Sequence, residues 1–197
     1  MDHNVKFDYQ NRAEAARQAR ANFKNYSKDL LQALRDAFHN SNRSLYQKLF
    51  AELRDLRTTE IYRNLLQASD SALEAAYPPN FWADFERLRS GDDLTALETA
   101  IEFLEADPYF FRSGYVKEKL LRYVRSYVLA PEHAYRLQRV ILNVVDSHFC
   151  RELREYCKLA RKLNTEELRL QLESRLQRTD MAVQKRARWV LDWLAKA

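Results

Sequence analysis

Apolar residues recur every three or four positions along most of the chain. In the first such stretch they are Ala13, Ala16, Ala19, Phe23, Tyr26, Leu30, Leu34 and Phe38. This spacing places side chains on one face of an α-helix. We therefore predict a long helix over 11–38, or two helices joined by a slight break. The polar run His39 to Asn42 follows as a connector.

Two more helices are predicted before the strongest break in the chain. A leucine stripe favours a helix over 45–56, and the next extends from Glu60 to about Ala76. Pro78 and Pro79 end it, because the residue before a proline is driven out of the helical conformation. We place a domain boundary there, between an N-terminal helical part of three helices (1–77) and a second helical part (80–197). The alternative is one continuous domain.

Beyond the prolines the pattern is regular. A short helix is predicted over 81–88, followed by helices over 92–106, 113–128, 132–146, 149–163, 165–178 and 181–195. Plausible N-caps are Ser113, Asn164 or Thr165, and Asp180 or Thr179. Helices of similar length about 18 residues apart form three antiparallel pairs, which is the period of an α-helical repeat array.

The last pair resembles a repeat of the HEAT or armadillo type. Such a repeat carries an Asp at its turn, then Val, a basic residue, Ala and Leu. The corresponding residues are Asp180, Val183, Lys185 or Arg186, Ala187 and Leu191. Gln184 stands where the basic residue usually lies, and 107–115 is similar to an inter-helix turn of these arrays. The resemblance covers 92–197 and implies a scaffold or recognition surface more often than an enzyme.

Composition favours the same fold class. The chain has only 2 glycines and 4 prolines, whereas sheets and tight hairpins need glycine at positive-φ turns. We expect an all-α fold, with antiparallel helix pairs stacked as a short HEAT-like α-α superhelix after an N-terminal helical segment. No apolar run approaches the length of about 18 residues that indicates a membrane span.

A cytoplasmic location is expected. The polar start Met1 to Asn4 argues against a cleaved signal peptide. Cys150 and Cys157 lie seven positions apart on one predicted helix, too far apart to form a disulfide with each other. Both are interpreted as small buried residues in a reducing compartment.

Motifs that carry chemistry are missing from the sequence. Phosphate loops and dinucleotide sites need clustered glycines. His148, Cys150 and Cys157 match no common zinc pattern, and Asp36-x-x-His39 occurs once where a di-iron bundle needs a pair of Glu-x-x-His motifs. The stripe Glu98, Glu102 and Glu105 is interpreted as a solvated face. We expect no catalytic residues, no metal and no cofactor; an enzyme with an unrecognised inter-helix pocket is the weaker alternative.

Charge is unevenly distributed. Residues 1–110 carry 14 Lys/Arg against 18 Asp/Glu, and residues 111–197 carry 19 against 10. The basic half should attract anionic partners. Equivalent helices of an array present the same side, so the basic faces of 113–128 and 149–163 should line up. Candidate anion- or partner-binding residues are Arg122, Arg125, Arg151, Arg154 and Lys158.

A different interpretation of these cations stays open. They can instead cover apolar surface and pair with the carboxylates of Glu118, Glu132, Glu152 and Glu155. A similar choice applies to the aromatic run Tyr109, Phe110, Phe111 and Tyr115, which with Arg112 is either a base-stacking platform or, as we favour, a hydrophobic plug.

The expected function is that of a non-enzymatic protein-interaction scaffold or adaptor. An acidic protein surface is the favoured partner, and self-association into a homo-oligomer is a further expectation. The alternative is a nucleic-acid-binding protein that uses the basic C-terminal half.

Overall fold

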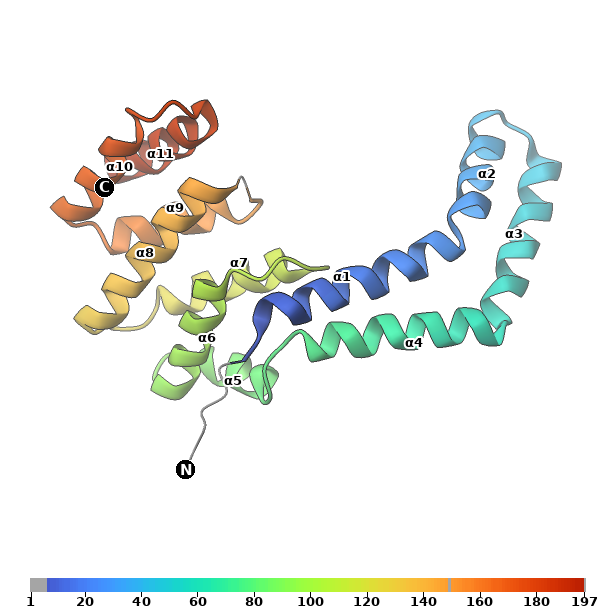
Figure 1. Ribbon diagram of the computed structural model, residues 1–197, viewed down its shortest axis with the longest axis horizontal. Coiled ribbons are helices and arrows are strands. Elements are labelled where there is room, and N and C mark those ends of the chain that lie inside the picture. Colours follow the sequence, from blue (N-terminus) through green and yellow to red (C-terminus); the bar gives the residue numbers. More distant parts are fainter. Residues whose placement is uncertain (1–6, 149, 197) are drawn as a thin grey trace. The chain divides into compact units, whose positions relative to one another are not determined.

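The structure is a computed structural model that describes residues 7–148 and 150–196. Every regular element in these ranges is an α-helix and none is a strand, which confirms the all-α prediction (Figure 1). No helix of the described ranges is both long and apolar enough to cross a membrane. The chain divides into two compact units: unit 1 runs up to Pro78 and includes Tyr109–Phe111, and unit 2 comprises Pro79–Pro108 and the chain from Arg112 onward.

Unit 1 has four helices where the sequence analysis predicted three. They are α1 (Tyr9–Tyr26), α2 (Lys28–His39), α3 (Arg43–Thr58) and α4 (Glu60–Ala75). The first predicted helix is broken at Ser27, so the predicted alternative of two helices joined by a slight break over 11–38 holds. The side chains of Asp8, Asn42 and Thr59 accept hydrogen bonds from backbone N–H groups in the first turns of α1, α3 and α4.

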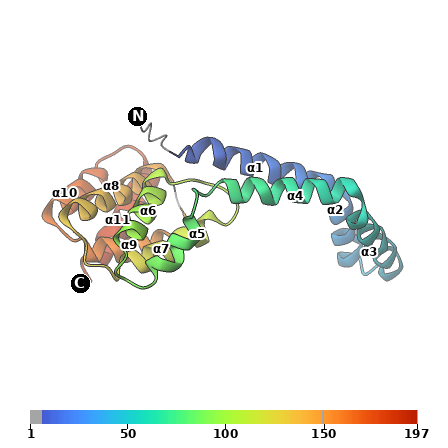
Figure 2. The same cartoon turned by 90° about the horizontal axis from the view of Figure 1, so that it is seen from below.

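The core of unit 1 lies between α1 and α4, which run side by side (Figures 1 and 2). Ala13 and Ala16 are buried on α1 and let the two helices approach closely. Phe110 packs edge-on against Tyr77, with ring centroids 5.1 Å apart. The guanidinium of Arg20 lies 4.4 Å from the centre of the Phe111 ring. The aromatic run at 109–111 thus contributes packing to unit 1.

Unit 2 contains the remaining helices. They are α5 (Phe81–Leu88), α6 (Leu94–Ala106), α7 (Ser113–Val124), α8 (Pro131–Ser147), α9 (Leu153–Lys162), α10 (Glu166–Arg175) and α11 (Met181–Leu194). Each corresponds to a predicted helix. Phe149, the predicted first residue of the helix over 149–163, lies outside the described residues. Helix α7 ends at Val124, four residues before the end predicted for this helix, and Val128 is 95% exposed.

The helices of unit 2 pack as stacked pairs. Helices α6 and α7, α8 and α9, and α10 and α11 contact each other as consecutive neighbours. In addition α6 packs on α8, α7 on α9, and α9 on α11. Contact between α7 and α9 is what the expected alignment of the helices over 113–128 and 149–163 requires. The core between these helices contains apolar side chains that are fully buried, among them Leu97, Ile101, Leu120, Leu137 and Leu159.

Helix starts in unit 2 follow the predicted capping chemistry in two of three cases. Thr165 accepts a hydrogen bond from the N–H of Leu168, and Asp180 accepts from two N–H groups of α11. Ser113 is not a cap: it is the first residue of α7 and is 1% exposed. The residue before it, Arg112, has a left-handed φ of 68° and turns the chain into the helix.

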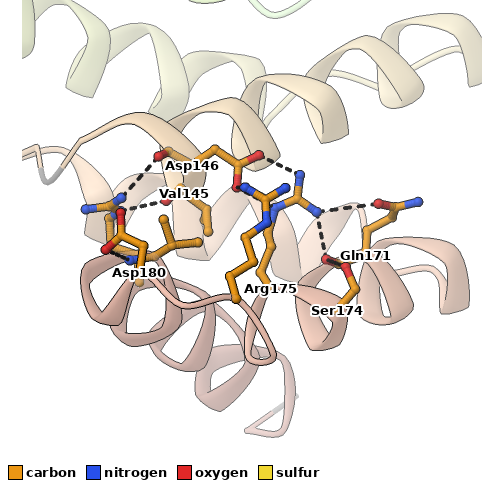
Figure 3. Close-up of polar contacts among 9 residues, drawn as sticks. Val145, Asp146, Gln171, Ser174, Arg175 and Asp180 are labelled. Carbon is orange, nitrogen blue, oxygen red and sulfur yellow. Dashed lines mark hydrogen bonds and ion pairs between the residues drawn. The ribbon is translucent and has the colours of Figure 1, made fainter.

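Arginines join the end of α8 to the last helix pair (Figure 3). Arg175 donates to both carboxylate oxygens of Asp146, at 2.9 and 2.7 Å, and Arg178 donates to one of them at 2.9 Å. Arg186 donates to the carbonyl oxygens of Val145 and Asp146, at 2.7 and 3.3 Å. Arg175 and Arg186 are 8% and 5% exposed, so these hydrogen bonds satisfy charges that water reaches poorly.

Removal of the Asp146 carboxylate should destabilise unit 2. We expect Asp146→Ala to lower the free energy of unfolding by about 2 kcal/mol, because Arg175 then stays buried without a counter-charge. Urea unfolding followed by circular dichroism measures this. Arg178→Ala is the control, since Arg178 is half exposed and its loss should cost about 0.5 kcal/mol. Equal losses in the two variants would contradict the role given to Arg175.

Candidate anion-binding site

Helices α7 and α9 bring four of the five predicted site residues together. Arg122 comes from α7 and Arg125 directly follows its last residue, while Lys158 comes from α9 and Arg151 lies just before α9. They surround two carboxylates, Glu118 and Glu155, which come from α7 and α9. We call these six residues the cation cluster. The local reason is the helical period, which puts each basic residue on the outer side of a helix whose other side is in the core.

Glu155 is the buried centre of the cation cluster, with 5% of its surface exposed. One of its oxygens accepts a hydrogen bond from Arg125 at 2.9 Å, and the other accepts from Lys158 at 2.6 Å. The Nε of Arg122 lies 3.9 Å from the second oxygen. A carboxylate that is desolvated but bonded to several cations orients them, since charge-assisted hydrogen bonds are short and directional.

Glu118 extends the network along α7. It pairs with Arg122 one turn later, and its other oxygen accepts a hydrogen bond from Arg151 at 3.3 Å. The guanidinium of Arg151 also lies 3.8 Å from the centre of the Tyr115 ring, in cation–π geometry. Tyr115, like the arginine, is exposed, so the stacked pair forms part of the surface of unit 2.

Arg154 is the predicted site residue that the structure leaves outside the network. It is exposed on α9 and forms no ion pair with any residue in the described ranges. The open alternative, pairing with glutamates, holds for Glu118 and Glu155. Neither Glu132 nor Glu152 forms an ion pair with these cations in the part of the chain that the structure describes. Pairing with glutamates therefore accounts for four of the five cations, and anion binding stays a prediction.

Positive charge remains after the internal pairing. Residues 113–125 and 151–162 together carry nine Lys/Arg and three Asp/Glu. Within the described ranges, the Nε of Arg125 is buried and has no hydrogen-bond partner. Lys162 donates to the carbonyl oxygens of Arg125 and Tyr127 at the end of α7, and burial, followed by the charge of Arg125, lowers the pKa of Lys162. The cluster thus combines fixed cations with an unused N–H donor.

Gly114 permits the close approach of the chain before α9 to α7. A Cβ atom at this position would lie 2.9 Å from a carboxylate oxygen of Glu152 and 3.5 Å from the Cγ of Arg151. Glu152 is 4% exposed, so it has little room to move away. One of the only two glycines in the sequence therefore lies where the cation cluster is assembled.

One buried cation was missed by the sequence analysis. Lys117 is 1% exposed and pairs with Asp107, and the Nε2 of His148 lies 3.7 Å from the other oxygen of Asp107. Asp107 has a left-handed φ of 44° at the end of α6. No sequence pattern indicated this pair, because it depends on how the end of α6 meets α7. The Lys117–Asp107 ion pair fixes the junction between α6 and α7 and so positions α7.

The acidic stripe on α6 is not a merely solvated face, so that prediction was wrong for two of its three residues. Arg136 of α8 donates to both oxygens of Glu105, at 2.9 and 2.7 Å, and also to Glu98. Hydrogen bonds to Glu105 are the main cause that raises the pKa of Arg136 above its usual range. Glu102, between them, is exposed. The stripe joins α6 to α8.

Both cysteines are free, and burial keeps them protonated. Burial raises the thiol pKa to about 12 in Cys150 and in Cys157, and the charges of Glu152 and Asp107 add to the effect at Cys150. No group of three or more His, Cys, Asp and Glu side chains within the described residues could hold a metal ion. Thiolates are the nucleophilic and metal-binding form, so neither cysteine is poised for such chemistry at neutral pH.

The thiols give a pH-dependent signature of folding. With pKa values raised to about 12, the folded state keeps protons that the unfolded state loses from about pH 8.5 upward. The free energy of unfolding should therefore fall as pH rises from 8 to 10. Urea unfolding at both pH values measures this, and Cys157→Ala should show a smaller fall. Rapid reaction of both thiols with a disulfide reagent in the folded protein at pH 8 would contradict their burial.

Comparison with known proteins adds no relative to this picture. Neither the family models, nor the curated proteins, nor the solved structures that were searched include a match to the chain. The geometry and charge of the cation cluster are the observations from which we infer a function.

Proposed function

We propose that the protein is a non-enzymatic interaction module whose cation cluster binds an acidic segment of a partner protein. The observation that carries this proposal is the set of cations held in place by Glu155. Arginine and lysine side chains that are already ordered lose less conformational entropy when an anion binds.

A HEAT-like arrangement of unit 2 is part of the proposal. Asp180 caps α11, and Val183 and Ala187 are buried, as the resemblance in the sequence implies. Of the two candidates for the basic residue, Arg186 is buried and bonds to the end of α8, while Lys185 is exposed. Stacking of α6 on α8 and of α7 on α9 supports the same arrangement. Repeat arrays of this kind present side chains of equivalent helices as one continuous binding surface.

The mixture of charges favours a protein partner over nucleic acid. Glu118 and Glu155 lie among the cations, and together they pair with Arg122, Arg125, Arg151 and Lys158. A nucleic-acid backbone presents phosphates in a continuous row and would meet these carboxylates as well as the cations. An acidic peptide carries separate carboxylates on flexible side chains, which can reach the exposed guanidinium groups of Arg122 and Arg151 and avoid Glu118.

Binding can be measured by the fluorescence anisotropy of a labelled, disordered peptide of alternating Glu and Ser. We expect Arg122→Gln combined with Arg151→Gln to weaken binding about tenfold at low salt, because each lost charge contact contributes about 0.7 kcal/mol. Lys185→Gln combined with Arg188→Gln is the matched control. It removes the same charge from exposed positions on α11 and should leave the affinity within about twofold.

Three outcomes would contradict the proposal. The first is that the peptide does not bind at low salt, and the second is that both double variants weaken binding equally, which would show a non-specific effect of net charge. The third is tighter binding of oligo(dT) or duplex DNA than of the peptide, with a steep dependence on salt. That result would favour the nucleic-acid alternative.

A further inference from the structure

The hairpin of α2 and α3 in unit 1 exposes a row of aromatic side chains. Phe38 is 70% exposed and Phe50 is 53% exposed. Tyr46 lies between them, with its ring centroid 6.1 Å from each of the other two, and stacks on Phe50. We call Phe38, Tyr46 and Phe50 the aromatic stripe. Periodicity placed Phe38 on the apolar face of its helix, so its exposure shows that this face lacks a cover within unit 1.

No third helix completes the hairpin. Within the described residues, α2 packs only on α1 and α3, and α3 packs only on α2 and α4, which are their neighbours along the chain (Figure 1). The buried residues are Leu34 and Ala37 on α2 and Leu53 on α3. Amphipathic helices normally bury a stripe of apolar residues against a further layer. The aromatic stripe lies on the side where this layer is missing.

The charges of the hairpin are segregated around the aromatic stripe. At 100° per residue, one set of cations falls on the same side as Phe38 and Phe50: Arg35, Arg43, Arg54 and Arg57. The carboxylates fall on the other sides of the two helices: Asp29, Asp36, Glu52 and Asp55. The contact between Arg54 and Asp55 is long, at 3.8 Å, and both side chains are about three quarters exposed. Such a pair is weak and leaves Arg54 available.

We propose that the aromatic stripe binds an amphipathic helix of another protein, with apolar residues flanked by carboxylates. Each step between neighbouring ring centroids of the stripe is 6.1 Å, close to the 5.4 Å pitch of an α-helix. The partner therefore presents apolar residues at i, i+4 and i+7, the spacing of helix-in-groove recognition. Its carboxylates meet Arg43 and Arg54 on the border of the stripe. Aromatic residues and arginine are also the types enriched at protein interfaces.

The arginines exclude a second copy of the same hairpin as the occupant. A symmetric dimer would place this surface against itself. The arginines beside Phe38 and Phe50 would then face other arginines, and like charges at an interface are costly. The inference concerns α2 and α3 alone and does not depend on the cation cluster of unit 2.

The test uses the full chain and a labelled helical peptide of about 15 residues, with Leu at the i, i+4 and i+7 positions and Glu beside them. We expect Phe50→Ala to weaken binding about tenfold, and Arg43→Glu combined with Arg54→Glu to do the same. Because these side chains are exposed, the helix content measured by circular dichroism should not change. Leu45→Ala and Lys48→Glu are the matched controls: both residues are exposed on other sides of α3, and binding should be unchanged.

Several results would overturn the inference. The inference is wrong if a peptide with Lys in place of Glu binds equally well, or if Leu45→Ala weakens binding as much as Phe50→Ala. It is also wrong if light scattering shows a dimer that Phe38→Ala dissociates. Displacement of the peptide by oligo(dT) or by vesicles of anionic lipid would contradict it as well. The combination of Arg122→Gln and Arg151→Gln separates the two proposals. It should leave this peptide bound, and loss of binding would assign the peptide to the cation cluster instead.

Discussion

Charged side chains buried between helices hold unit 2 together. Arg175 binds Asp146 between α8 and α10, and Arg186 binds backbone carbonyls at the end of α8. Lys117 binds Asp107 where α6 meets α7. Each of these cations is less than 10% exposed. A buried cation tolerates only the arrangement that keeps its oxygen partners, because loss of a partner leaves a desolvated charge. These contacts therefore fix the order and spacing of the helices more strictly than apolar contacts do.

The same constraint changes how the basic charge of the C-terminal half is understood. Residues 111–197 carry 19 Lys/Arg against 10 Asp/Glu, which the sequence analysis treated as charge available to partners. In the structure Arg136, Arg175 and Arg186 are engaged in joints between helices. The cation cluster differs because Arg122 and Arg151 have about half of their side chains exposed. A count of charges along the chain could not separate these two groups, since the difference depends on which helix ends meet.

Properties that depend on one helix were predictable from the sequence, while those that depend on contacts between helices were less so. The 3.6-residue period located the helices of unit 2, and the repeat spacing indicated that α7 and α9 line up. The capping roles of Thr165 and Asp180 also follow from local chemistry. Lys117 and Ser113 were not predicted as buried, because the end of α6 and the turn at Arg112 decide their surroundings. The pairing of Glu98 and Glu105 with Arg136 has the same cause.

Unit 1 shows what happens when an apolar face lacks such a joint. In α1 the small residues Ala13 and Ala16 let α4 approach closely, and the apolar face is buried. In α2 and α3 the corresponding face carries Phe38 and Phe50, which are large and remain exposed. Arginine thus has different roles at two places: Arg175 and Arg186 are buried and fix the last helix pair of unit 2, whereas Arg43 and Arg54 are exposed beside the aromatic surface of unit 1.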